Sequence, residues 1–487
     1  MGNRSRTVSI HILDDDSLLH VFYLSRPFLS GEDQDDNARQ WGGGWIVTRG
    51  RWWYKPAQVC QRWRNIIFGS ASYLGLFLVC TYGTPVADML AHSPPLPLIV
   101  CYSKKGRDVT TDDERGIVLA LKQRERVLRV HLSSLDSSLL VEKFAAVMDE
   151  EFPILEHLTI TVPIADNRTI LIFPENLQAP HLRRLWLRGF QVAIPMGSRF
   201  FTSAVNLVTL KLVMVHQSTY FHPNALLQWV SLMPQLEALN IHFKLSTPNR
   251  DVERQLTHTS IIAPLILPNL RHFAFHGVST YLEALVHRIT SPRLKKMKIE
   301  LFSQLTFFVP RLLQLMNAAE DLRFHSADLA FLDGKVVVSI YPQGGIGNVN
   351  MFAFDIRVFC WHLDWQVSSM VQISNSLNQV FSAVEHLNLV HEVHDRSSEE
   401  HNEVDRAEWR RLLRPFSNVK TLRIVEAPGL IEELSRCLRL EDGELPLEVF
   451  PELQELTYSG TGNTGDGFTS FIDARRNAGH PVKLDRQ

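Results

Sequence analysis

A glycine-rich phrase near the end of the sequence is the first group of residues that could do chemistry. Gly460, Gly462 and Gly465 have the Gly-x-Gly-x-x-Gly spacing that lets a backbone turn approach the pyrophosphate of a dinucleotide. A dinucleotide site also needs a second strand and an acidic side chain about 20 residues further on, and neither follows here. We therefore expect a glycine loop of the last repeat. The alternative, a nucleotide-dependent enzyme, predicts that a nucleotide would stabilise the protein against heat.

A cluster of histidines in a charged segment is the second such group. His391, Glu392, His394 and His401 offer nitrogen and oxygen atoms of the kind that bind zinc. His391 and His394 are three residues apart, however, whereas the zinc motif His-Glu-x-x-His separates its histidines by four. The sequence also lacks a Gly-x-Ser-x-Gly nucleophile turn, a phosphate-binding loop and the protein-kinase motifs. We expect no enzymatic activity, no cofactor and no metal site.

The elements that would position any functional residue are indicated by a recurring apolar triplet. Its members lie at offsets 0, +3 and +5, as in Leu155, Leu158 and Ile160. The period of two at the end of each triplet predicts a short strand with one buried face. The triplet returns about every 24 to 35 residues, a spacing typical of stacked repeats that cannot bury their apolar faces alone. Further triplets begin at Val127, Leu182, Leu207, Leu236, Leu270, Leu294, Val384, Val419 and Leu453.

Segments of helical period lie between these strand phrases. They cover residues 139–148, 225–232, 281–289, 309–319, 407–413 and 430–438. Alternating strands and helices predict parallel strands on one side and helices on the other. The predicted fold class is therefore α/β: an irregular leucine-rich-repeat-like solenoid, a horseshoe or arc, over residues 117–487, preceded by a linker and capping region at 76–116.

One interval breaks the repeat. Between the phrase Leu322-x-Phe324 and Val384 lie two β-like runs, at residues 336–341 and 351–359, separated by several glycines. Glycines between two such runs are typical of a hairpin turn. The interval is either a pair of degenerate repeats or a projecting hairpin, and the sequence leaves both open.

Residues 8–75 carry two helix-like stretches, split by an insertion at 27–56. The first has carboxylates suited to helix capping, followed by Leu13, Leu18, Leu19 and Phe22, and the second has Val59, Cys60 and Trp63 at helical spacing. The phrases Leu-x-Asp-Asp-x-Leu-Leu-x-x-Phe and Val-Cys-x-x-Trp-Arg-x-Ile together resemble an F-box, particularly of the fungal F-box-like type. Asp14 stands where most F-boxes have proline, and it can cap the same helix.

The resemblance implies a small all-helical module that docks on the Skp adaptor of a cullin ubiquitin ligase, while the repeats bind a protein substrate. The adaptor would be contacted by Leu13, Leu18, Leu19, Phe22, Val59, Cys60 and Trp63. Two alternatives stay open. Leu13, Leu18, Leu19 and Phe22 could simply form the core of the helical module. The chain could also be a repeat-based interaction scaffold that is not coupled to ubiquitination.

The strand phrases also predict an outward-facing surface. If positions +3 and +5 point inward, then +4 and +6 point to the exposed face of the sheet. That face is modestly basic and suggests a partner protein with an acidic segment. The predicted substrate-binding residues are Trp186, Arg188, Lys211, His242, His276, Lys298 and Arg323.

Composition excludes several classes of protein. A hydrophobic fraction of 45% and a charged fraction of 21% are ordinary globular values, and the net charge of −2 favours neither nucleic acid nor a membrane surface. The five cysteines are odd in number and widely spaced, which indicates reduced thiols. The first residues lack the apolar run of a signal peptide, and no apolar run is long enough to span a bilayer. We expect a cytoplasmic or nuclear protein.

Overall fold

The structure is a computed structural model that divides into two compact units, Met1–Leu207 and Val208–Gln487. It describes residues 12–27, 50–103, 110–133, 138–162, 171–172, 174–189, 192–193, 199–215, 221–244, 264–343, 352–392, 404–425, 428–439, 447–458 and 468–486. Within these residues, no helix combines the length and the apolar character needed to cross a bilayer.

The first unit begins with helices α1 (Asp15–Leu24), α3 (Tyr54–Val59) and α4 (Gln61–Gly69). Asp14 caps α1 by accepting a hydrogen bond from the backbone N–H of Ser17 at 2.7 Å, as its sequence position predicts. Cys60 has extended backbone angles, so the chain leaves the helical path there and α4 starts as a separate helix. Between α1 and α4, Arg62 donates hydrogen bonds to Asp15 Oδ1 at 2.8 Å and to the carbonyl of Leu13 at 2.6 Å.

The same unit contains five parallel strands in the order β1, β2, β3, β4, β6. Their bounds are Leu78–Thr81, Leu98–Ser103, Val127–Ser133, His157–Thr161 and Arg184–Arg188. Helices α5 (Val86–His92), α6 (Thr111–Leu121), α7 (Ser138–Met148) and α8 (Arg199–Ser203) accompany them, with the short strand pair β5 (Leu171–Ile172) and β7 (Val192–Ala193). The segment expected to cap the repeats thus contributes the first two strands.

The second unit contains a larger sheet in the order β8, β9, β11, β13, β16, β15, β14, β17, β18, β19, β20. The strand bounds are Thr209–Val215, Ala238–Phe243, His272–Gly277, Lys296–Leu301, Phe354–Phe359, Lys335–Tyr341, Ser326–Leu332, His386–Glu392, Thr421–Val425, Glu455–Tyr458 and Lys483–Arg486. A two-residue pair, β10 (Leu265–Ile266) with β12 (Ile289–Thr290), lies apart from it.

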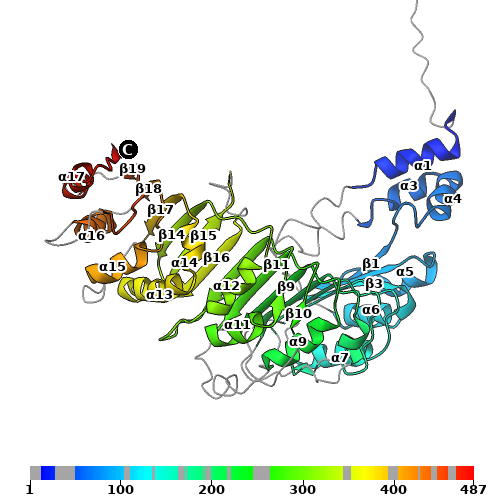
Figure 1. Ribbon diagram of the computed structural model, residues 1–487. Coiled ribbons are helices and arrows are strands. Elements are labelled where there is room, and N and C mark those ends of the chain that lie inside the picture. The colour runs from blue at the N-terminus through cyan, green and yellow to red at the C-terminus, as the bar shows by residue number, and fades with distance from the viewer. Residues whose placement is uncertain are drawn as a thin grey trace, which may run out of the picture. The chain divides into compact units, whose positions relative to one another are not determined.

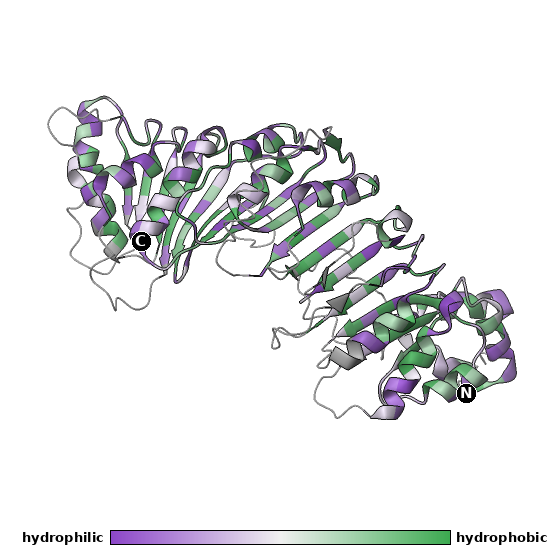
Figure 2. Ribbon diagram, turned by 90° about the horizontal axis from the view of Figure 1, so that it is seen from below, coloured by the Kyte–Doolittle hydropathy of each residue, from purple (hydrophilic) through white to green (hydrophobic). Residues whose placement is uncertain are grey.

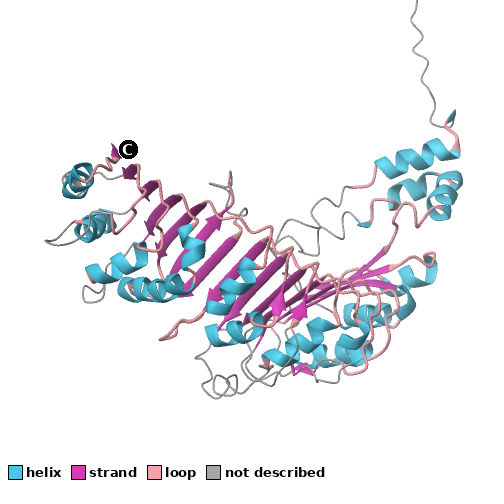
Figure 3. Cartoon of the chain, in the orientation of Figure 1, coloured by secondary structure: helices cyan, strands magenta, loops and turns pink. Residues whose placement is uncertain are grey.

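The helices of the second unit are α9 (Pro223–Ser231), α11 (Ser279–Val286), α12 (Pro310–Asn317), α13 (Leu363–Ser376), α14 (Asn378–Ser382), α15 (Arg406–Leu413), α16 (Pro428–Leu438) and α17 (Thr469–Asn477). Helices α11, α12, α13 and α15 lie along one face of the sheet, which gives the layered α/β arrangement that the sequence predicts (Figure 1, Figure 3). Every predicted helical segment overlaps one of the described helices, although the segment 281–289 extends beyond the end of α11 to the first residue of β12.

The triplet residues form the core between the strands and the helices. Leu155, Leu158, Leu182 and Leu185 in the first unit are completely buried, and so are Leu270, Leu294 and Met297 in the second. Hydrophilic and hydrophobic residues alternate along the strands, as Figure 2 shows, because successive side chains point to opposite faces. The triplet is therefore the structural spine of both units.

The interval that breaks the repeat forms part of the sheet. After α12 the chain enters β14, turns back as β15 and turns again as β16, which pairs in parallel with β13. Strand β14 then pairs in parallel with β17. The two predicted β-like runs do form an antiparallel hairpin, β15 with β16, but the hairpin lies within the sheet between β13 and β14 instead of projecting from it. The strand expected at Leu322-x-Phe324 is wrong, because β14 starts at Ser326 and its inward residues are Ala327, Leu329 and Phe331, all fully buried.

Candidate functional site

The helical module buries one stripe of α1 and exposes another. Leu18 and Phe22 are 0% and 3% exposed, and Phe22 meets Trp63 edge-to-face with ring centroids 5.0 Å apart. These two residues are core, so the prediction that they contact an adaptor is corrected. The reason is helical phase: the stripe that suited a partner in the sequence is the one that packs on α4.

Four other apolar side chains of the module face solvent. Ile12, Val21, Leu24 and Val59 are 74%, 40%, 68% and 60% exposed. Val21 and Leu24 are three apart on α1 and therefore neighbours on its surface. Val59 is exposed because α3 ends there, before the extended Cys60. Of the remaining predicted adaptor contacts, Leu13, Leu19, Cys60 and Trp63 are half-buried, and sequence reasoning missed Ile12, Val21 and Leu24.

The predicted substrate-binding residues fall in different environments. Trp186 and Arg188 lie half-buried on β6 of the first unit. In the second unit, Lys211 and His242 are half-buried on β8 and β9, and Lys298 is on β13. Arg323 is exposed but precedes β14, so its expected place on a strand is wrong.

His276 also departs from the prediction, because it is 5% exposed. The centroid of its ring lies 3.9 Å from the ring centroid of His242, and 4.9 and 5.4 Å from the ring centroids of Phe302 and Phe359. Its Nδ1 is 3.4 Å from Glu300 Oε2, a contact that falls short of a hydrogen bond. Burial, with His242 nearby, lowers the pKa of His276 to about 3, so the ring is neutral at pH 7.

The open face of the second unit's sheet is not a free basic surface. Lys298 Nζ lies 2.8 Å from Glu300 Oε1, and Arg357 forms hydrogen bonds of 2.7 and 3.0 Å to Asp355, which is 1% exposed. Burial raises the pKa of Glu300, but Lys298, His276 and Arg357 together hold that pKa below its usual value, so the carboxylate is charged at neutral pH. Lys298 of the predicted surface and its neighbour Arg357 are thus paired with carboxylates of this chain.

Large apolar side chains gather instead where β13 and β16 end. Leu305 and Phe308 follow β13 and are 91% and 71% exposed, while Trp361 and Trp365 follow β16 and are 74% and 55% exposed. Because β13 and β16 are parallel neighbours, both loops leave the same edge of the sheet. Gln372 of α13 joins them: its side chain accepts a hydrogen bond from Phe307 N at 2.8 Å. We call these four side chains the edge patch.

The chemical candidates of the sequence gain no support from the described residues. The glycine phrase at 460–465, His394 and His401 lie outside the described residues. His391 is half-buried on β17. The described cysteines are free thiols, and burial raises the pKa of Cys80 to about 11 and of Cys101 to about 12, as expected for unreactive core positions.

Comparison with known proteins gives little. No protein-family model matches the chain, and no curated protein sequence matches it. Among solved structures, the crystal structure of a TLR13–ssRNA13 complex is similar over 84% of this chain and 48% of that one, at 14% identity and a TM-score of 0.29. The chain spans about half the length of that protein. At so low a TM-score the likeness assigns neither fold nor function.

The class of protein therefore comes from the structure itself. It is a mixed α/β protein with large parallel sheets, a helix between most strands and one buried apolar triplet per repeat. Such sheets offer extended surfaces. The large exposed apolar side chains include those of the helical module and those of the edge patch.

Proposed function

We propose that this chain is a substrate-recognition subunit of a Skp–cullin–F-box ubiquitin ligase. The helical module docks the Skp adaptor, and through it the cullin, while the repeats hold a protein substrate. The subunit acts by position: it raises the effective concentration of a substrate lysine near the charged ubiquitin-conjugating enzyme and performs no chemistry itself.

The observation that carries the proposal is the exposed apolar set of the helical module, Ile12, Val21, Leu24 and Val59. Small helical units rarely leave several large apolar residues in water without a partner. Val21 and Val59 lie within the two phrases that resemble an F-box, and Ile12 and Leu24 flank the first phrase. The resemblance and the exposure therefore point to one docking surface. The packing between α1 and α4 that holds this surface in place includes Leu18, Phe22 and Trp63.

Substrate binding is assigned to the edge patch. Tryptophan is enriched among the residues that dominate binding energy at protein interfaces. Trp361 follows β16 and Trp365 is on α13, and both come from the same edge of the sheet as Leu305 and Phe308. The expected ligand is a protein segment with apolar side chains. The paired charges of the sheet face would form a polar border rather than the binding centre.

Adaptor docking is tested by Val21→Lys combined with Leu24→Lys. Each lost anchor costs about 2 kcal/mol or more, so each should weaken adaptor binding at least about 30-fold. The matched control is Leu119→Lys on α6, which replaces a 42% exposed helical leucine of the same unit. Co-purification of the Skp adaptor should be lost in the double variant and kept in the control. Equal co-purification with both variants would refute the docking surface.

A second candidate function is an interaction scaffold that is not coupled to ubiquitination. It is favoured by the burial of Leu18 and Phe22, which fits an F-box-like module used only as a structural cap. The scaffold would bind its partner through the edge patch and would not bind an adaptor. Proximity labelling in cells that express wild type, Trp361→Ala or the control Ile266→Ala should identify a partner that is lost only in the Trp361→Ala variant. If proteasome inhibition makes this partner accumulate, the ligase function is supported; if it does not, the scaffold function is supported.

A further inference from the structure

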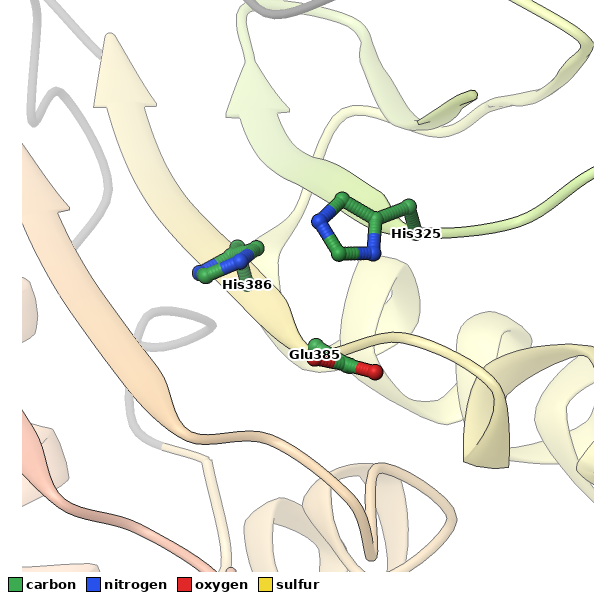
Figure 4. Close-up of side chains that lie close together, drawn as sticks. All are labelled: His325, Glu385 and His386. Carbon is green, nitrogen blue, oxygen red and sulfur yellow. The ribbon is translucent and has the colours of Figure 1, made fainter. Parts of the chain in front are cut away.

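A group of metal-ligand side chains lies at the opposite edge of the second unit's sheet from the edge patch. His325 directly precedes β14, Glu385 directly precedes β17, and His386 is the first residue of β17. One nitrogen or oxygen from each of the three lies within 4.8 Å of the others, and each residue is half-buried (Figure 4). The ring centroids of His325 and His386 are 4.8 Å apart.

The backbone fixes this arrangement. Strands β14 and β17 are parallel neighbours with Ser326 opposite His386. The carbonyl of His325 accepts hydrogen bonds from Glu385 N at 2.8 Å and from His386 N at 3.3 Å. Three side chains from positions 60 residues apart in the chain are thus held at one point by rigid strand pairing.

We propose that His325, Glu385 and His386 form a binding site for a divalent zinc-type metal ion. Two imidazoles and one carboxylate are a donor set that zinc uses, with the fourth position left to water or another ligand. Tetrahedral zinc holds its ligand atoms about 3.4 Å apart, given metal–ligand distances of about 2.1 Å. Small side-chain rotations close the remaining gap, because none of the three is locked by full burial.

Two neighbouring residues define how the site would work. His386 Nδ1 lies 2.7 Å from Thr421 Oγ1, so a hydrogen bond there orients the ring and leaves Nε2 for the ion. Lys420 Nζ lies 2.7 Å from Glu385 Oε2, and its positive charge would weaken the binding of a cation. The other carboxylate oxygen, Glu385 Oε1, would bind the metal. The Lys420 side chain is 44% exposed and can turn into solvent. No short sequence motif marks the site, because its ligands come from two strands.

A bound ion would stabilise the sheet at the point where the insertion ends. Strands β15 and β16 lie between β13 and β14, so the regular repeats resume only where β14 meets β17. An ion shared by His325 and His386 would link the start of β14 to the start of β17. The site is independent of adaptor docking, which depends on the helical module of the other unit.

The test is a Zn²⁺ titration of the full-length chain, with a chelator of known affinity as competitor. Wild type should bind one ion that His325→Ala or His386→Ala weakens by roughly 100-fold or more, beyond the 10- to 100-fold typical of outer-shell changes. Thr421→Val should weaken it about 10-fold, and Lys420→Gln should tighten it, because the competing ammonium is gone. His480→Ala, which replaces an exposed histidine of the same unit, is the matched control.

A second readout keeps the test independent of folding defects. Zn²⁺ should slow amide exchange in β14 and β17 of wild type, and should not do so in the His325→Ala protein, whose exchange without metal should match wild type elsewhere. Zinc binding that survives both histidine substitutions would place the ion elsewhere and overturn the proposal, as would failure of wild type to bind Zn²⁺.

Discussion

Buried His276 makes the stability of the second unit depend on pH. The ordinary pKa of histidine is 6.5, and burial lowers that of His276 to about 3 in the folded chain. Above pH 6.5 the ring is neutral in both states and contributes no pH dependence. Between pH 6.5 and about 3 the unfolded chain binds a proton that the folded chain does not, so stability falls as pH falls.

The size of the effect follows from the two pKa values. Each pKa unit corresponds to about 1.4 kcal/mol, so complete protonation of the unfolded state would cost at most about 5 kcal/mol. Between pH 7 and pH 5 alone, the expected loss is about 2 kcal/mol. Among the neighbouring charges, Glu300 raises the pKa of His276, whereas His242 and Lys298 lower it further.

Amide hydrogen exchange of peptides from β9 and β11 measures this loss locally. His276→Leu keeps the side-chain volume and removes the titrating ring. Between pH 7 and pH 5, the free energy of opening should therefore fall by about 2 kcal/mol less in this variant than in wild type. His480→Leu, at an exposed position of the same unit, should behave as wild type. If His276→Leu and wild type lose equal stability over this range, the burial account of His276 is refuted.

Three further substitutions test other features of the fold. Leu18→Ala should destabilise the helical module by about 2 to 5 kcal/mol, seen in urea unfolding, because its side chain is fully buried. Arg475 is fully buried and donates to three backbone carbonyls, so Arg475→Met should cost about 3 kcal/mol and open the C-terminal repeat to proteolysis. Gly189→Ala should lower the melting temperature of the first unit, because φ at Gly189 is +78° and the new Cβ would lie 2.1 Å from the Val162 carbonyl oxygen. The control Gly69→Ala should leave the melting temperature unchanged, because open space surrounds Gly69.

The sequence predicted the strands well because their signal is local. Leu155, Leu158 and Leu182 are buried by their own repeat and its neighbours, and a period of two is enough to find them. Strand β14 was misplaced because Leu322 precedes it and its own inward series begins with the small Ala327. The order of β14, β15 and β16 depends on pairing between distant strands, which no local pattern encodes.

The functional residues were harder to predict for the same reason. His242 and His276 occupy equivalent repeat positions, but His242 is half-buried, whereas His276 is buried against Phe302 and against Phe359 from a strand added by the insertion. On α1 the sequence indicated an amphipathic helix, yet which stripe faces α4 depended on packing. Glu385 and His386 are adjacent to a predicted strand, but His325 joins them only through the β14–β17 pairing.

The central claim, that the helical module docks a Skp adaptor, is tested most directly with purified components. Titration of the Skp adaptor into the full-length chain should give saturable 1:1 binding by calorimetry. Val21→Lys with Leu24→Lys should abolish it, and the Leu119→Lys control should bind as wild type does. Absence of binding by a folded wild-type chain would contradict the proposed function and leave the interaction scaffold in its place.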